Sequence, residues 1–439
     1  MPKFIPFIII LLLTFGAMAQ DEATPEATEA PALTERIPWD KETINLFATL
    51  PVQDNGRVKP LDTLAQFTAL KINGKRSNID GVGRGMNNNI HLQWYLDCLF
   101  YPELASDYAC FVVDDYAVLT AIGIEEHEEK KSRYSYNELT PGRGQLMTLA
   151  QQYSQKEPTE RDPVENQILN LAENLFQFDQ MIHFFDFSWK RFNIVNGTTR
   201  FAKAFSDEAG LPLSEMILRS QAVMNELISS KGTIGEEEAN AEINDFFKLF
   251  QQAELATKLA TGTDFFPPLD PENKEWYSPA KLFNTAVNFP QATEEHVELL
   301  ALFEALPQLR DDRSAFKAKL KEYHTAVVQA ATQRGEYNKI PMEVHFYKVQ
   351  YLFYSQILFV FSFFLVALSW LFPGSKWLNR ATIISILIPT VLLIIGITLR
   401  CIIRGRPPVS TLYETVLFIT ATAIVCALFM EFFNRQRIA

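Results

Sequence analysis

Three arginines and one glutamate near the C-terminus have the types and spacing that most directly indicate binding chemistry. Arg400, Arg404 and Arg406 lie close together, and Glu414 follows eight residues after the last of them. Guanidinium groups hold carboxylates and phosphates through two parallel hydrogen bonds. The spacing therefore indicates a site for an anionic group. The alternative is that these arginines pair with lipid phosphates or with acidic residues elsewhere in the chain.

The residues between the arginines and Glu414 are those that end one helix and begin another. Pro407 and Pro408 favour an extended chain, and Ser410 or Thr411 can cap the following helix, with Glu414 in its first turns. A carboxylate just inside a membrane helix is costly unless it faces protein or a polar cavity. We therefore expect the loop and the start of the helix to form one polar structure.

Motifs for turnover chemistry are missing from the sequence. It contains no H-E-x-x-H, G-x-S-x-G, Walker loop, dinucleotide fingerprint or C-x-x-C-H. Cys98 and Cys110 could close a short disulfide loop or remain as two reduced core thiols, and both alternatives are open.

The charge distribution divides the chain into two parts. Of its 439 residues, 48% are hydrophobic and 21% charged, with a net charge of -12. From Val349 onward there are seven Lys/Arg and two acidic residues, a net charge of +5, so the preceding residues carry -17. An acidic body joined to a basic, apolar tail excludes a single soluble domain. The acidic body also argues against nucleic acid as a partner.

The N-terminus has the pattern of a secretory signal peptide over residues 1–19. Lys3 precedes an apolar run, and Ala17 and Ala19 supply the small residues of a cleavage site. The run is shorter than the roughly 20 residues that an uncleaved anchor needs. Residues 20–38 are rich in Pro, Ala, Thr and Glu, which predicts a flexible tether.

Three membrane spans are predicted near residues 349–372, 381–400 and 411–433, because these stretches are long and apolar. If the body is exported, Lys376, Arg380 and the basic C-terminus lie inside, as basic loops usually do. Arg400, Arg404 and Arg406 would then lie outside, against that rule. The position of these arginines on the outer side therefore requires a functional explanation more than that of any other segment.

We expect a mainly α fold, with an exported helical domain at residues 39–345 and a membrane domain at residues 346–439. Apolar residues recur at three- to four-residue steps, which predicts helices. The predicted helices are Asn166–Trp189, Ser214–Ile228, Thr293–Leu306 and Ser314–Thr332. Strands are expected at Phe111–Val113 and Ala117–Ile122. Prolines between Pro267 and Pro279 predict an irregular connection.

Two segments carry a resemblance to a known family. The run from Gly405 to Thr415, GRPPVSTLYET, resembles the G-x-x-P-x-S-N-L-Y-E-S segment of system II cytochrome c biogenesis proteins, which handle and export haem. The run from Gly56 to Ala65, GRVKPLDTLA, is similar to the G-R-x-K-P-L-D-T-x-A segment that opens the exported domain of large fused members. A weaker match is the run Glu336–Lys339, just before the first span.

The resemblance implies a component of the cytochrome c biogenesis machinery in the bacterial inner membrane, with a large periplasmic domain. Such a chain would assist haem delivery or presentation at the outer face, with apocytochrome c as a partner. The family's tryptophan-rich haem segment has no counterpart among the six isolated tryptophans. A second subunit would have to supply it, and haem attachment would belong to the assembly rather than to this chain. The alternative is a membrane-anchored periplasmic binding or scaffold protein with no haem contact.

Within this resemblance, four residues are the expected haem-contacting positions. Arg404 and Arg406, with Glu414 in the same segment, would shape the site for the haem propionates. His345 is the only histidine at the predicted outer membrane edge, and its imidazole could ligate the iron. The alternative for His345 is an interfacial position beside Phe346 and Tyr347.

Overall fold

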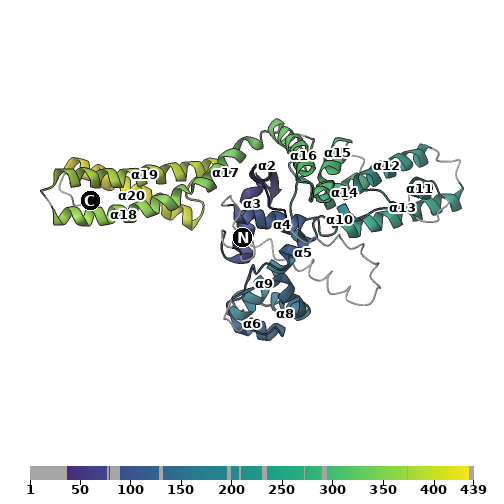
Figure 1. The fold of residues 1–439 in the computed structure, drawn as a ribbon, viewed down its shortest axis with the longest axis horizontal. Helices are drawn as coiled ribbons and strands as arrows, with labels where there is room; N and C mark the ends of the chain where they lie inside the picture. The colour runs from purple at the N-terminus through teal and green to yellow at the C-terminus, as the bar shows by residue number, and fades with distance from the viewer. Residues whose placement is uncertain are drawn as a thin grey trace. The chain divides into compact units, whose positions relative to one another are not determined.

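A computed structural model describes residues 37–434, except residues 77–78, 80–88, 128–131, 195–198, 207–208, 230–234, 271, 289–293 and 373. The predicted signal peptide and most of the predicted tether lie outside the described residues. The chain divides into two compact units between Ala331 and Thr332 (Figure 1). Helices make up most of the described residues, which confirms the predicted mainly α fold.

The first unit is helical, and its helices form local groups. α6, α8 and α9 pack together as one group, and α11 packs on α12 and α13 in another (Figure 1). The helices of this unit are α2 (Lys41–Ala48), α3 (Leu61–Asn73), α4 (Ile90–Phe100), α5 (Pro102–Ala105), α6 (Tyr116–Ile122), α7 (Tyr136–Leu139), α8 (Arg143–Ser154), α9 (Pro163–Ile182), α10 (Asp186–Trp189), α11 (Arg200–Ala204), α12 (Leu213–Ser229), α13 (Glu236–Thr257), α14 (Pro279–Asn288), α15 (Glu294–Glu304) and α16 (Arg313–Gln333), with the short 3-10 helices η1 (Thr140–Gly142) and η2 (Pro307–Leu309).

Two small antiparallel sheets complete this unit. β1 (Pro51–Asp54) pairs with β2 (Arg57–Pro60), and β3 (Phe111–Val112) pairs with β4 (Arg133–Tyr134). The strand predicted at Phe111–Val113 is thus confirmed at its first two residues. The β1–β2 hairpin is absent from the sequence prediction, although Asn55-Gly56, both at positive φ, is the pair that favours a tight hairpin turn.

The strand predicted at Ala117–Ile122 is wrong, because these residues form helix α6. Asp115 accepts a hydrogen bond from the backbone N–H of Ala117 and caps the helix, and Gly123 ends it in the left-handed conformation. The apolar, β-branched composition suggested a strand. Caps at both ends outweigh that preference.

Aromatic rings join helices that are distant in the sequence. The ring of Phe100 lies within 5.1–5.8 Å of the rings of Trp39, Phe47, Phe185 and Phe316. Each aromatic pair contributes roughly 0.5–1.5 kcal/mol beyond its buried area. This cluster ties α2, α4 and α16 to the turn before α10.

The second unit begins with η3 (Tyr337–Lys339) and α17 (Ile340–Val349), followed by α18 (Tyr351–Leu371), α19 (Lys376–Arg404) and α20 (Leu412–Asn434). Three helical stretches, Tyr337–Leu371, Lys376–Arg404 and Leu412–Phe433, are long and apolar enough to cross a membrane, as predicted. Gln350, with φ of 53°, separates α17 from α18.

Small residues let α18 and α19 pack closely. Ser355, Ser362 and Ser369 recur at seven-residue steps on α18 and are buried. The Ser362 hydroxyl donates a hydrogen bond to the carbonyl of Ser385 on α19. Small and hydroxylated residues at such interfaces are typical of membrane helix pairs.

Candidate functional site

The end of α19 and the start of α20 are joined by a short capped connection. Gly405 adopts the left-handed conformation, with φ of 66°, and closes α19. The Thr411 hydroxyl accepts a hydrogen bond from the backbone N–H of Glu414 at 3.3 Å. Of the two predicted caps, Thr411 is therefore the one used, and Ser410 instead donates to the carbonyl of Pro407. The connection sets Glu414 opposite the last turns of α19.

Glu414 is the centre of a cluster of charges. Its side chain is only 4% exposed, and its Oε1 lies 3.0 Å from Arg400 Nε and 3.6 Å from Arg406 Nη2. The Arg400 guanidinium also lies over the Tyr413 ring, 5.5 Å from its centroid. A buried carboxylate is tolerated only with such partners. The predicted polar structure is therefore present, with Arg400 as its closest pair.

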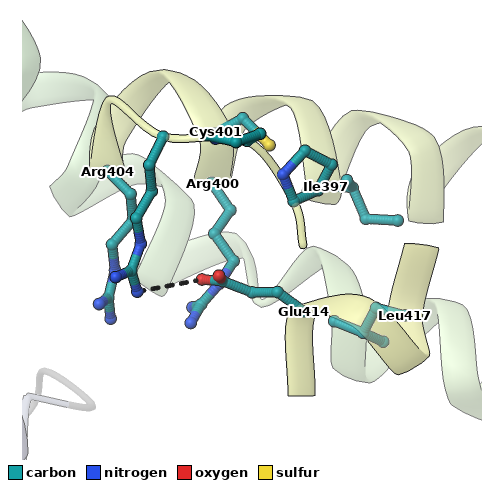
Figure 2. A pocket seen from close by; sticks show the side chains of 9 residues that line it. Ile397, Arg400, Cys401, Arg404, Glu414 and Leu417 are labelled. Carbon is teal, nitrogen blue, oxygen red and sulfur yellow. Dashed lines mark hydrogen bonds and ion pairs between the residues drawn. The ribbon is translucent and has the colours of Figure 1, made fainter. Parts of the chain in front are cut away.

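Arg404 and Arg406 lie with Glu414 around one pocket. Figure 2 shows the side chains of Arg400 and Arg404 pointing to the side of α19 on which Glu414 lies. The pocket holds about 250 Å³, part of it open to solvent. Its lining has three arginines, one acid and an otherwise apolar wall: Ile397, Arg400, Cys401, Arg404, Arg406, Pro407, Pro408, Glu414 and Leu417.

The lining of the pocket is positively charged. Three guanidinium groups against one carboxylate leave a net charge of +2 on the lining. Arg404 forms no ion pair with any residue that the structure describes. Because the volume of about 250 Å³ includes open solvent, the pocket encloses at most a small group such as a carboxylate.

Lys339 adds a further cation beside this loop. A Cβ built on Gly405 would lie 3.5 Å from Lys339 Nζ. The resemblance in the sequence includes the runs Glu336–Lys339 and Gly405–Thr415. These two runs are thus in contact within this unit. The sequence did not predict that contact.

His345 lies near the level of the arginines but does not line their pocket. Gly396 of α19 lies against Tyr351 and Leu352, and Gly405 lies against Lys339. The chain between these contacts, which includes His345, therefore runs past the last turns of α19. The His345 ring is exposed, and its Nε2 lies 3.0 Å from the Tyr351 hydroxyl. Among the described residues, no group of three or more His, Cys, Asp or Glu residues could hold a metal ion.

The upstream match Gly56–Ala65 has a structural role in this chain. Its first residues form the turn and strand of the β1–β2 hairpin, and Leu61 begins α3 with its side chain fully buried. Asp62 Oδ1 and His91 Nε2 are hydrogen-bonded at 2.9 Å, and both side chains are buried. These contacts account for Leu61 and Asp62 without a ligand.

A second polar cluster joins α7 and α8 to α9. Asp179 lies 2.7 Å from the Tyr136 hydroxyl, and Arg143 donates to the same carboxylate. Burial raises the pKa of Asp179, and these hydrogen bonds oppose that effect. Burial, together with the bond to Asp179, raises the pKa of Tyr136 to about 12. This cluster links three helices of the first unit, and its residues do not line the pocket beside Glu414.

Cys98 and Cys110 are free thiols, and both are buried. This matches the second of the two alternatives left open by the sequence. Burial raises the pKa of each thiol.

Sequence reasoning did not select Lys339, and it named Arg400 with the other arginines without placing it among the expected haem-contacting positions. A simple signal points to Arg400. In two antiparallel helices joined by a short loop, residues at similar distances from the loop face each other. Arg400 precedes the connection by about one turn and Glu414 follows it by less than one turn. Lys339 has no such signal, because its contact depends on how α17 packs.

The fold and site define a helical protein with three candidate membrane-spanning helices and a cationic pocket between the last two. Comparison of the chain with protein-family models and with curated proteins found no match.

Proposed function

We propose that this chain is a component of a system II type cytochrome c biogenesis machinery in a bacterial inner membrane. It assists the delivery or presentation of haem at the outer face, and its first unit, on the periplasmic side, positions apocytochrome c or a partner subunit. That partner carries the tryptophan-rich haem segment. The observation that supports the proposal is that Arg406, Pro407, Pro408 and Glu414 of the Gly405–Thr415 segment line one cationic pocket, together with Arg400 and Arg404 of α19.

The pocket residues fit haem as cargo at its acidic edge only. Haem has two carboxylates on an apolar ring, and the pocket offers two arginines beyond the Arg400–Glu414 pair, beside Ile397 and Leu417. Guanidinium groups hold carboxylates well. His345 is the candidate iron ligand of this proposal. The hydrogen bond between its Nε2 and the Tyr351 hydroxyl would have to break before this nitrogen could bind iron.

The test is the covalent haem content of the cell's c-type cytochromes. A strain that lacks this chain should lose haem-stained c-type cytochromes, and the intact gene should restore them. Restoration should fail with Arg404→Gln combined with Arg406→Gln. It should succeed with Arg380→Gln, an exposed arginine at the other end of α19. A deletion strain with normal haem-stained cytochromes would refute the proposal.

A second candidate is a membrane-anchored scaffold with no haem contact. It is favoured by the fact that Arg400 and Arg406 already have an internal partner in Glu414. In that case the deletion strain loses cytochromes, but the double arginine variant restores them fully.

A further inference from the structure

The two arginines that contact Glu414 approach the same oxygen. Arg400 Nε and Arg406 Nη2 both lie near Oε1, whereas Oε2 is buried and takes part in no hydrogen bond. Arg406 Nε is also buried without a hydrogen bond. Glu414 thus shares its charge between two cations and leaves hydrogen-bonding capacity unused on both sides.

The two contacts differ in strength. The 3.0 Å contact of Arg400 is close to the 2.7–2.9 Å of charge-assisted hydrogen bonds, and its side chain is 18% exposed. The 3.6 Å contact of Arg406 is longer than such a bond, and its side chain is 38% exposed. Arg406 also lies in the connection rather than in a helix. Arg400 is therefore the fixed partner of Glu414, and Arg406 is the one that can change partner.

From this asymmetry we infer that Glu414 is an internal competitor for the ligand of the pocket. The inference rests on the proposed function, takes its dicarboxylate ligand from it, and adds how the site is regulated before that ligand binds. Arg404 and Arg406 bind the two carboxylates, and Arg406 leaves Glu414 as it does so. Arg400 stays in place and keeps Glu414 paired.

Charge favours a dicarboxylate over a phospholipid with a single phosphodiester, and Lys339 adds a further cation beside the pocket. The lining has a net charge of +2, which two carboxylates neutralise. A phosphodiester headgroup such as phosphatidylcholine or phosphatidylglycerol has one negative charge on its phosphate. Lipid is therefore the competing outcome that the experiment must recognise.

The experiment compares two porphyrins on the full-length chain purified in phosphatidylcholine nanodiscs. Zinc protoporphyrin has two free carboxylates, and its dimethyl ester has the same ring without the charges. Binding is followed by porphyrin fluorescence. We expect the free acid to bind at least about fivefold more tightly than the ester, because the ester cannot form charge-assisted hydrogen bonds with the arginines.

The variants test the competitor role of Glu414 and the attraction by the arginines. Glu414→Gln removes the competing charge at nearly the same size, so it should tighten binding of the free acid at least about fivefold and leave the ester unchanged. Arg404→Gln and Arg406→Gln should each weaken the free acid, and Arg380→Gln should change neither. If Glu414→Gln fails to fold, Glu414→Asp serves, because the shorter carboxylate draws back from Arg406 and should also tighten binding.

Each other outcome has a definite meaning. If the free acid is preferred but both Glu414 variants leave it unchanged or weaken it, the competitor role is wrong and the proposed function stands. Equal binding of acid and ester, or binding of neither, overturns the inference, and the deletion strain then tests the proposed function separately. If nanodiscs with phosphatidylglycerol abolish binding of the free acid, the pocket is a lipid headgroup site and the inference is overturned.

Discussion

Replacing Glu304 with glutamine should remove a pH dependence of stability in the first unit. Glu304 is 5% exposed, and both of its carboxylate oxygens accept hydrogen bonds from Ser214, one from the hydroxyl and one from the backbone N–H. Burial raises the pKa of Glu304 from its ordinary 4.5 to about 7, despite those bonds. The folded state therefore holds a proton that the unfolded state has lost.

The sign and size of the effect follow from that difference. The stabilising contribution is complete below pH 4.5 and is lost as the pH rises through about 7. Each pKa unit corresponds to about 1.4 kcal/mol, so the loss approaches about 3 kcal/mol in the free energy of unfolding. Glutamine resembles the protonated acid. The variant should thus lose this part of the pH dependence and exceed the wild type in stability at pH 8.

The assay is urea unfolding of both proteins between pH 5 and pH 8, followed by tryptophan fluorescence. The difference between wild type and Glu304→Gln isolates this carboxyl from other titrating groups. Glu298→Gln, an exposed position on the same helix α15, is the matched control and should follow the wild type. A wild-type-minus-variant difference that stays constant across this pH range would refute the reasoning.

Three further predictions concern the first unit and the membrane edge. Trp39→Phe keeps an aromatic ring but removes the Nε1–H that donates to the fully buried Asp97 at 2.8 Å, so it should lower the free energy of unfolding by about 1–3 kcal/mol in urea titrations. If the free energy of unfolding falls by less than about 0.5 kcal/mol, Asp97 has found another hydrogen-bond donor. Buried Cys98 and Cys110 should resist alkylation until the protein unfolds. In intact cells Cys401 should react with a membrane-impermeant thiol reagent, and labelling only after the inner face is exposed would reverse the proposed topology.

Periodicity predicted the long elements well, and three of the four predicted helices differ from the observed ones by one or two residues at each end. The helix expected at Asn166–Trp189 is divided, because α9 ends at Ile182 and α10 begins at Asp186. Phe184, Phe185 and Phe187 are all buried, so the apolar pattern continues while the backbone turns. A pattern of buried residues alone cannot distinguish one continuous helix from two helices joined by a turn. The three membrane spans were easier to predict, since a candidate span needs only sufficient length and an apolar composition.

The candidate site could be predicted from the sequence only in its residue types. Arg404, Arg406 and Glu414 are near one another in the chain, so a capped connection brings them together by local geometry alone. Lys339 joins them because the chain packs along α19, where Gly396 lies against Tyr351 and Leu352 of α18 and Gly405 lies against Lys339. That contact depends on tertiary structure, and the sequence shows two glycines without showing what lies against them.

The charge pair at the pocket is itself an argument for a ligand. Replacing a buried ion pair with apolar residues is often neutral or stabilising, so Arg400 and Glu414 are not explained by stability alone. Arginines that only anchored the helix end would extend separately toward lipid phosphates. Instead, two of them share one oxygen of a buried acid, and Arg404 remains beside them with no ion pair among the described residues. Such an arrangement holds cations in place before a ligand arrives, and it lowers the cost of assembling three like charges around one pocket.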